Sequence, residues 1–299
     1  MQIIINPPTA FSFKRTAISH GWSDLPPFDI DLNNWTLTRV LDVGDQKPVT
    51  VTISDADGAV KIETRSKLSK RAAARLSEDV RHMLRLDDDM SPFYECMMRE
   101  ADFAWIAEAG AGRLLRSPTV YEDLVKTICT TNCSWGLTKK MVQGLVDNLG
   151  RETNNKRRNF PTAEAMAAES EKFYRDEVRA GYRAGYLKEL AERVASGSLD
   201  VESWLTSEQP TAELRKEMKR VKGVGDYAAE NLLKLIGRYD CLALDSWVRS
   251  QFARTRNKGR ATPDKKIEKY YSRFGEWRGL ALWCDMTKSW MDETGAVTF

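Results

Sequence analysis

The sequence is poor in residues that bind metals. Its 299 residues include only two histidines, His20 and His82, and five scattered cysteines. Cys129 and Cys133 lie four residues apart in a helical pattern, but no other cysteine or histidine nearby completes a zinc site. The spacing also argues against an iron–sulfur cluster held by four cysteines. We expect the cysteines to be free, buried thiols.

The sequence also lacks a long apolar run. No stretch approaches the roughly 18 to 20 apolar residues that cross a bilayer. The first residues, MQIIINPPTAFSFKR, do not have the order of charge, apolar run and cleavage site that marks a signal peptide. We therefore expect a globular protein in the cytoplasm, with no membrane partner. Nothing in the sequence indicates an obligate protein partner.

A large excess of charge is missing as well. The net charge is +3 and the isoelectric point is about 8.5, so any binding of nucleic acid must depend on local clusters of lysine and arginine. Taken alone, each such cluster is better explained by a solvated helix face. Clusters occur at 67–75, 139–140, 156–158, 216–222 and 254–260.

Two periodicities divide the chain near residue 66. After it, from residue 69 to 292, apolar residues recur with the helical period. Before it, alternating or β-branched segments predict a small antiparallel sheet at 2–5, 36–43, 48–54 and 59–65. The expected fold class is α+β, with a sheet domain at 1–66 and a mostly helical body at 67–299.

The segment 214–249 carries the clearest functional pattern. Two helical patterns flank the turn Lys222-Gly223-Val224-Gly225, and an apolar run, 241–244, then leads to Asp245. The glycines permit a tight turn and leave bare amides beside a helix start, where a phosphate can bind. Because most helix connections contain glycine for steric reasons, the turn alone is weak evidence for binding, and packing explains it better.

With its neighbours, this segment resembles the helix-hairpin-helix superfamily of DNA glycosylases, in particular its 8-oxoguanine and alkyladenine branches. The resemblance covers about residues 110–250 and includes RLLRSP at 113–118, LVKTICTTNCSW at 124–135 and AGYRAGYL at 180–187. It implies a two-lobed helical body with the helix-hairpin-helix at about 213–238 and the catalytic aspartate segment at 239–249.

Two residues of this segment bear on the chemistry. Asp245 is the candidate catalytic residue, because a carboxylate near C1′ can stabilise the cation that forms when an N-glycosidic bond breaks; it also fits a helix N-cap. In relatives that cut the backbone, a lysine stands two residues after the last glycine, where this chain has Tyr227. The resemblance therefore implies a monofunctional enzyme. Lys234, further along, is explained by solvation or phosphate contact.

The resemblance also implies how DNA is held. Asn132 would fill the gap left by the extruded base, Tyr182 would act as a wedge, and Arg183 would contact the estranged base. The backbone carbonyls of Lys219, Val221 and Val224 match those that hold a monovalent cation, K⁺ or Na⁺; no other cofactor is required. The remaining expected DNA contacts are Lys219, Lys222, Gly223, Val224, Gly225 and Arg249.

The base pocket is the least familiar part of the sequence. Tyr227, Trp247, Trp22 and Phe28 are aromatic residues able to stack on a base, and His20 is a candidate donor to a base edge. Core packing explains the aromatic residues as well, and a surface position or a loop cap explains His20.

The leading hypothesis is a monofunctional glycosylase that removes a damaged or modified base from double-stranded DNA. Three alternatives remain. The first is a glycosylase for bulky modified pyrimidines of foreign (phage) DNA, which are removed in host defence. The second is a bifunctional glycosylase/lyase with a displaced lysine. The third is a non-catalytic DNA-binding protein that uses the hairpin for backbone contact.

Overall fold

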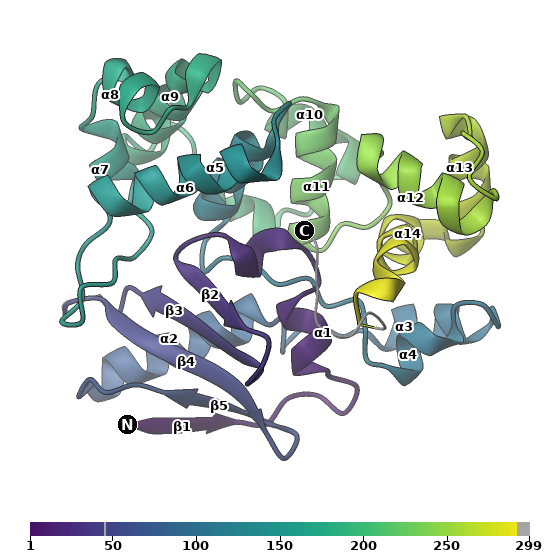
Figure 1. Cartoon of the computed structure of the whole chain (residues 1–299), viewed down its shortest axis with the longest axis horizontal. Coiled ribbons are helices and arrows are strands. Elements are labelled where there is room, and N and C mark those ends of the chain that lie inside the picture. Colours follow the sequence, from purple (N-terminus) through teal and green to yellow (C-terminus); the bar gives the residue numbers. More distant parts are fainter. Residues whose placement is uncertain (45, 292–299) are drawn as a thin grey trace.

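Five antiparallel strands form one sheet in the computed structural model, which describes residues 1–44 and 46–291 (Figure 1). The strand order is β1-β5-β4-β3-β2. In β4, Val49, Val51 and Ile53 are buried while the residues between them are less so, which is the period-two pattern of a sheet with one covered face. The strands are β1 (Gln2–Ile5), β2 (Phe28–Asp31), β3 (Thr36–Leu41), β4 (Val49–Ala56) and β5 (Ala59–Glu63).

The α+β class and four of the strands agree with the sequence prediction. The prediction missed β2, which has only four residues and directly follows the Pro26-Pro27 pair. It also missed the short helix α1 (Phe13–Ala17), which the Ser12 hydroxyl caps by accepting from the Arg15 amide. Both elements are too short to show a clear period.

Helices make up most of the remaining described chain. Several begin at a serine or threonine whose hydroxyl accepts from an amide of the first turn, as at Ser69, Thr119 and Ser134. The longer helices are α2 (Lys70–Met83), α3 (Ser91–Met98), α5 (Val120–Thr130), α6 (Trp135–Leu149), α9 (Ala184–Ala195), α10 (Thr211–Met218), α11 (Asp226–Ile236), α12 (Ser246–Arg256), α13 (Asp264–Tyr271) and α14 (Arg278–Thr287). Shorter ones are α4 (Ala104–Glu108), α7 (Ala163–Ala167), α8 (Glu171–Asp176), and the 3₁₀ turns η1 (Gly21–Asp24), η2 (Gly181–Arg183), η3 (Glu202–Thr206), η4 (Ser272–Trp277) and η5 (Lys288–Met291).

A buried charge cluster joins the sheet to the helices. Glu122 of α5 accepts from Arg39 of β3 at 2.5 Å and pairs with Lys126 at 2.7 Å. All three side chains are at most 4% exposed. The hydrophobic core is also continuous across this junction, since Val51 and Leu76 belong to the same buried cluster. The sheet and the helices are therefore packed as one unit.

The described residues offer neither a membrane span nor a metal cluster. None of their helices is long and apolar enough to cross a bilayer, and no three of their His, Cys, Asp or Glu side chains are grouped to hold a metal ion. The cysteines are free; Cys129 and Cys284 are buried and the others partly exposed.

Candidate active site

A tight turn joins α10 to α11. The Val224 amide donates to the Val221 carbonyl at 3.1 Å, and Gly223 between them has a φ of +88°. A β-carbon on Gly223 would lie 2.8 Å from Cδ2 of Tyr186, so glycine is required here for both backbone and space. Gly225 then starts α11 with no side-chain cap. The first amides of α11 thus remain available to an anion.

Asp245 lies at the start of α12. Its Oδ1 accepts from the Val248 amide at 2.6 Å, and the side chain is half-buried. The preceding loop is held by Glu230 of α11, whose Oε2 accepts from the Ala243 amide at 2.7 Å. Asp245 is therefore the N-cap that the sequence allowed, and the capping bond leaves Oδ2 for a second partner.

Asp245 and the turn line one cavity of about 810 Å³. Clefts of about 990 and 1350 Å³ lie beside the sheet, but neither contains Asp245. The walls of the Asp245 cavity come from the end of α5, η2, α9, the turn, the start of α11 and the start of α12. The first and last of these segments are more than a hundred residues apart in the sequence. Of the predicted site residues, the cavity brings together Asp245, Tyr227, Asn132, Tyr182, Lys219, Val221, Lys222, Gly223, Val224 and Gly225.

Tyr227 lies beside Asp245 on the cavity wall. Burial, and then the neighbouring Asp245 carboxylate, raise the pKa of the Tyr227 hydroxyl above its usual range. The hydroxyl is consequently protonated at neutral pH and acts as a donor toward the carboxylate. The first turn of α11 and the start of α12 thus place an aromatic ring and a carboxylate on the wall of the same cavity.

Asn132 and Tyr182 meet at the cavity mouth. Asn132 is exposed in a left-handed conformation, with φ of 47°, and its Nδ2 lies 3.5 Å from the Tyr182 hydroxyl. Tyr182 is 53% exposed, which is unusual for a large aromatic side chain in the described structure. Fifty residues of sequence separate the two. Both residues line the cavity that contains Asp245, and their gap-filling and wedge roles stay predictions.

Arg183 does not reach the cavity. It is 3% exposed, its Nε donates to the Thr131 hydroxyl at 3.2 Å, and its Nη2 donates to the Thr131 carbonyl. The structure thus contradicts the prediction that Arg183 contacts the estranged base. The guanidinium is already hydrogen-bonded to Thr131 at the C-terminal end of α5. Arg183 instead holds the backbone next to Asn132 in place.

The predicted phosphate-binding side chains are exposed but paired with carboxylates. Every side chain in these pairs is at least 32% exposed. Water and a phosphate can therefore compete with each carboxylate for its basic partner. The pairs are Lys219 with Asp226 at 2.6 Å, Lys222 with Glu189 at 2.5 Å, and Arg249 with Asp264 at 2.8 Å.

Trp22 and Phe28 lie in the core and not in the Asp245 cavity. The Trp22 indole donates to Asp123 at 2.6 Å and is 7% exposed. Phe28 is 5% exposed, with the Arg39 guanidinium 4.2 Å and the Lys126 ammonium 4.8 Å from its ring centroid. The expected stacking of these two rings on a base is corrected, since each is covered by partners from distant segments.

His20 is buried as well, and it is not in the cavity. A ring nitrogen donates to the Leu115 carbonyl at 2.6 Å, and burial lowers the pKa of His20 to about 4. The imidazole is therefore neutral at neutral pH. The prediction that His20 donates to a base edge is contradicted, and so is a surface position, because the ring is buried against the Leu115 carbonyl. His20 is the N-cap residue of η1, but its side chain makes no capping bond.

Acidification from pH 6.5 to 4 is expected to destabilise the protein through His20. The unfolded chain binds a proton near pH 6.5, whereas burial lowers the folded pKa to about 4, so stability is lost as the pH falls through this window. The full difference corresponds to roughly 3 kcal/mol. Denaturant titrations at pH 7.5 and 4.5 should show a smaller loss for His20→Gln than for wild type. Equal losses would contradict this assignment.

Trp247 belongs to an aromatic cluster behind Asp245. Its ring centroid lies 5.6 Å from that of Trp283 and 5.8 Å from that of Trp290. The ammonium of Lys234 lies 4.9 Å from the centroid of Trp283. Trp247 is half-buried and does not line the cavity with Asp245. Its stacking on a base stays a prediction.

Lys234 is buried, contrary to the sequence prediction that it is solvated or contacts a phosphate. It is 2% exposed, and its Nζ has no hydrogen-bond partner among the described residues. Solvation and phosphate contact are therefore both wrong as explanations. The available signal was its spacing, because Lys234 follows Tyr227 by seven residues and so lies on the same face of α11.

Several solved DNA glycosylases match this architecture over almost the whole chain. The 3-methyladenine DNA glycosylase from Archaeoglobus fulgidus has a TM-score of 0.76 at 20% identity, covering 98% of this chain and 100% of its own. The 8-oxoguanine glycosylase/lyase from Clostridium acetobutylicum has a TM-score of 0.74 at 20% identity, covering 94% of each. The chain has a DNA glycosylase fold.

A third structure with this glycosylase fold, MBOgg1 in complex with a low-affinity DNA ligand, has a TM-score of 0.76 at 21% identity, covering 98% of this chain and 96% of its own. No protein-family model and no curated protein sequence matches the chain. The likeness is therefore one of fold, and it includes relatives named for two different kinds of substrate base.

Proposed function

We propose that this protein is a monofunctional DNA glycosylase that extrudes a damaged or modified base from duplex DNA and hydrolyses its N-glycosidic bond. The observation that carries the proposal is the cavity shared by Asp245, Tyr227, Asn132 and Tyr182, which lies next to the α10–α11 turn. In this proposal α10, the turn and α11 form the helix-hairpin-helix, and the free amides of α11 hold a phosphate.

The chemistry then follows from Asp245. As the bond between C1′ and the base breaks, its electron pair leaves with the base and positive charge develops on the sugar. The Asp245 carboxylate stabilises this charge and accepts a proton from the water whose oxygen bonds to C1′. Val248 and Glu230 keep the carboxylate in position, through the cap and through the Ala243 amide.

Tyr227 supports the monofunctional assignment. A lyase requires an amine that attacks C1′ and forms a Schiff base, and the phenol next to Asp245 cannot form one. Lys219 and Lys222 line the cavity but are paired with Asp226 and Glu189. Their proposed partner is the DNA backbone.

We also propose that the turn holds a monovalent cation that bridges to a DNA phosphate. Lys219, Val221 and Val224 all line the cavity wall, and carbonyl oxygens are suitable ligands for K⁺ or Na⁺. The Val221 carbonyl accepts one hydrogen bond, from Val224, and has a second lone pair for the ion. The ion would supply positive charge next to the phosphate.

Duplexes that each contain one modified base test the proposal. The expected product is an abasic site that is cut only after alkali, with no adduct trapped by borohydride. Tyr227→Lys provides a matched control, because an amine at this position should yield a trapped adduct. A trapped adduct with wild type would contradict the monofunctional assignment. DNA binding without excision of any base would favour a non-catalytic role.

A further inference from the structure

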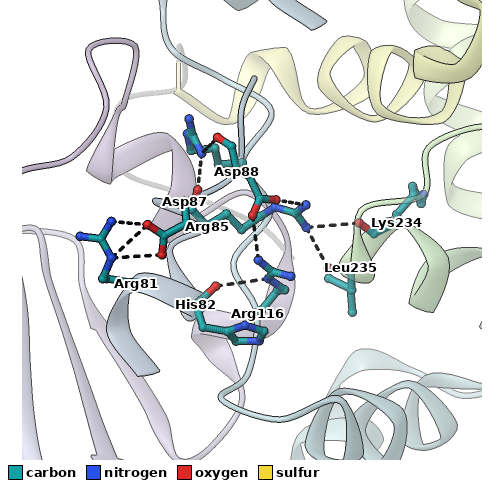
Figure 2. Close-up of polar contacts among 9 residues, drawn as sticks. Arg81, His82, Arg85, Asp87, Asp88, Arg116, Lys234 and Leu235 are labelled. Carbon is teal, nitrogen blue, oxygen red and sulfur yellow. Dashed lines mark hydrogen bonds and ion pairs between the residues drawn. The ribbon is translucent and has the colours of Figure 1, made fainter. Parts of the chain in front are cut away.

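Lys234 is a buried residue of α11 whose charge interacts with that of Asp245. It follows Tyr227 by two helical turns, so both side chains lie on one face of α11. Its backbone is fixed from the other side, where Arg85 donates to the carbonyls of Leu235 at 2.8 Å and of Lys234 at 3.5 Å (Figure 2). The side chain ends over the ring of Trp283.

Charged groups lie near Lys234, but none of the described residues accepts a hydrogen bond from its ammonium. Burial lowers the pKa of Lys234 to about 8, while Asp245 and Glu230 raise it. The thiols of Cys241 and Cys284 also face it, and Lys234 in turn contributes to the lowered pKa of His20. The amine is thus protonated at neutral pH, yet Nζ has no hydrogen-bond partner in the described part of the chain.

A lone ammonium in this place is unfavourable for folding. Burial of an unpaired charge is strongly destabilising, and an apolar side chain of similar length, such as methionine, would fill the same space without this penalty. The cation–π contact with Trp283 offsets only part of it. The fold alone therefore does not account for an amine at this position.

Lys234 lies against a cluster of three tryptophans through its contact with Trp283. The centroids of Trp247, Trp283 and Trp290 lie 5.6 to 6.2 Å apart. Trp247 follows Asp245 by two residues, so the rings stand close to Asp245 in the sequence, and a role for them requires that a base whose sugar lies at Asp245 extends toward them. Aromatic faces stack on any base and do not by themselves distinguish one base from another.

We propose that Lys234 selects the base that is excised. Its ammonium donates to a carbonyl oxygen or an anionic group on the edge of the extruded base, and it repels bases that carry a positive charge. The inference rests on the proposed glycosylase function and narrows its substrate to oxygen-bearing, neutral or anionic bases. Cationic alkylated purines would stack on the tryptophans, but a second positive charge close by, in a site closed to water, disfavours them.

Lys234→Met tests the proposal, because it removes the charge and nearly keeps the shape. Single-turnover excision is measured on the oxygen-bearing base that the wild type removes fastest and on 7-methylguanine, which is cationic. The variant should lose about tenfold on the first, because a buried donor to the base is gone, and should gain on the second. In wild type, the preference should fall as the pH rises through about 8, where the amine loses its proton; in Lys234→Met it should not change.

The outcomes separate this inference from the proposed function. No excision of any base by wild type overturns both. Excision with a cationic base as the fastest substrate, or an equal change on both substrates in Lys234→Met, overturns the role of Lys234 alone. Thermal unfolding serves as the fold control, since Lys234→Met should be at least as stable as wild type once the unpaired charge is removed.

Discussion

Asp245→Asn is expected to slow base excision strongly and to leave the fold and duplex binding intact. Removing the carboxylate takes away both the charge opposite the sugar cation and the acceptor for the proton of water, and we expect the single-turnover rate to fall about 10³-fold. Asparagine is as good an N-cap as aspartate, so the bond to the Val248 amide can persist. The measurement is the rate of abasic-site formation on the best substrate, together with duplex affinity.

Two further variants separate charge from capping. Asp245→Ala loses the charge and the cap and should also lose about 1 kcal/mol of stability. Asp200→Asn changes an aspartate whose Oδ1 accepts from the amides of Glu202 and Ser203 at the start of η3, outside the cavity. It should leave the rate unchanged. An active Asp245→Asn would mean that another group, and not this carboxylate, stabilises the sugar cation.

Glu122→Gln is expected to cause the largest loss of stability. Burial raises the pKa of Glu122, but the charges of Arg39 and Lys126 outweigh it and keep the pKa below its usual value. Glutamine at this position leaves two buried cations without their anion, and breaking such a cluster typically lowers the free energy of unfolding by about 3 to 5 kcal/mol. Because the cluster joins β3 to α5, the sheet and the helices should lose stability together.

A surface pair provides the control for this prediction. Glu192 pairs with Lys188 one turn away on α9 and is 55% exposed, so Glu192→Gln should change stability by less than about 0.5 kcal/mol. Denaturant unfolding followed by tryptophan fluorescence and by circular dichroism measures both variants. Similar losses for the two would show that the buried cluster contributes no more than an exposed pair.

The parts predicted correctly from the sequence are those that depend on local spacing. Alternation located four of the strands, and the resemblance to the glycosylase motif, which includes the interval from the turn to Asp245, implied that the two share a site; both line one cavity. Phe28 and Trp22 could not be placed in this way, because what covers them comes from α5, about a hundred residues away. An aromatic side chain in the core and one in a pocket have the same local pattern.

The burial of Lys234 could not be predicted from local spacing either. A lysine in a helical pattern is normally assigned to the solvent face, since lysine is rarely buried. Its burial depends on Trp283 and Asp245, which follow it in sequence and reach it only through tertiary packing. Charge at a buried position is therefore the part of this site that required a structure.

The carboxylate partners of the basic side chains at the turn have a consequence for DNA affinity. Basic proteins gain much of that affinity from the cations that leave the DNA when lysines and arginines reach its phosphates. Here each phosphate would displace a carboxylate, and the freed carboxylate would attract a cation from solution in its turn. Net counterion release is then smaller than the number of basic residues suggests, and affinity at this surface varies less with salt concentration. The pairs concerned are Lys219–Asp226, Lys222–Glu189 and Arg249–Asp264.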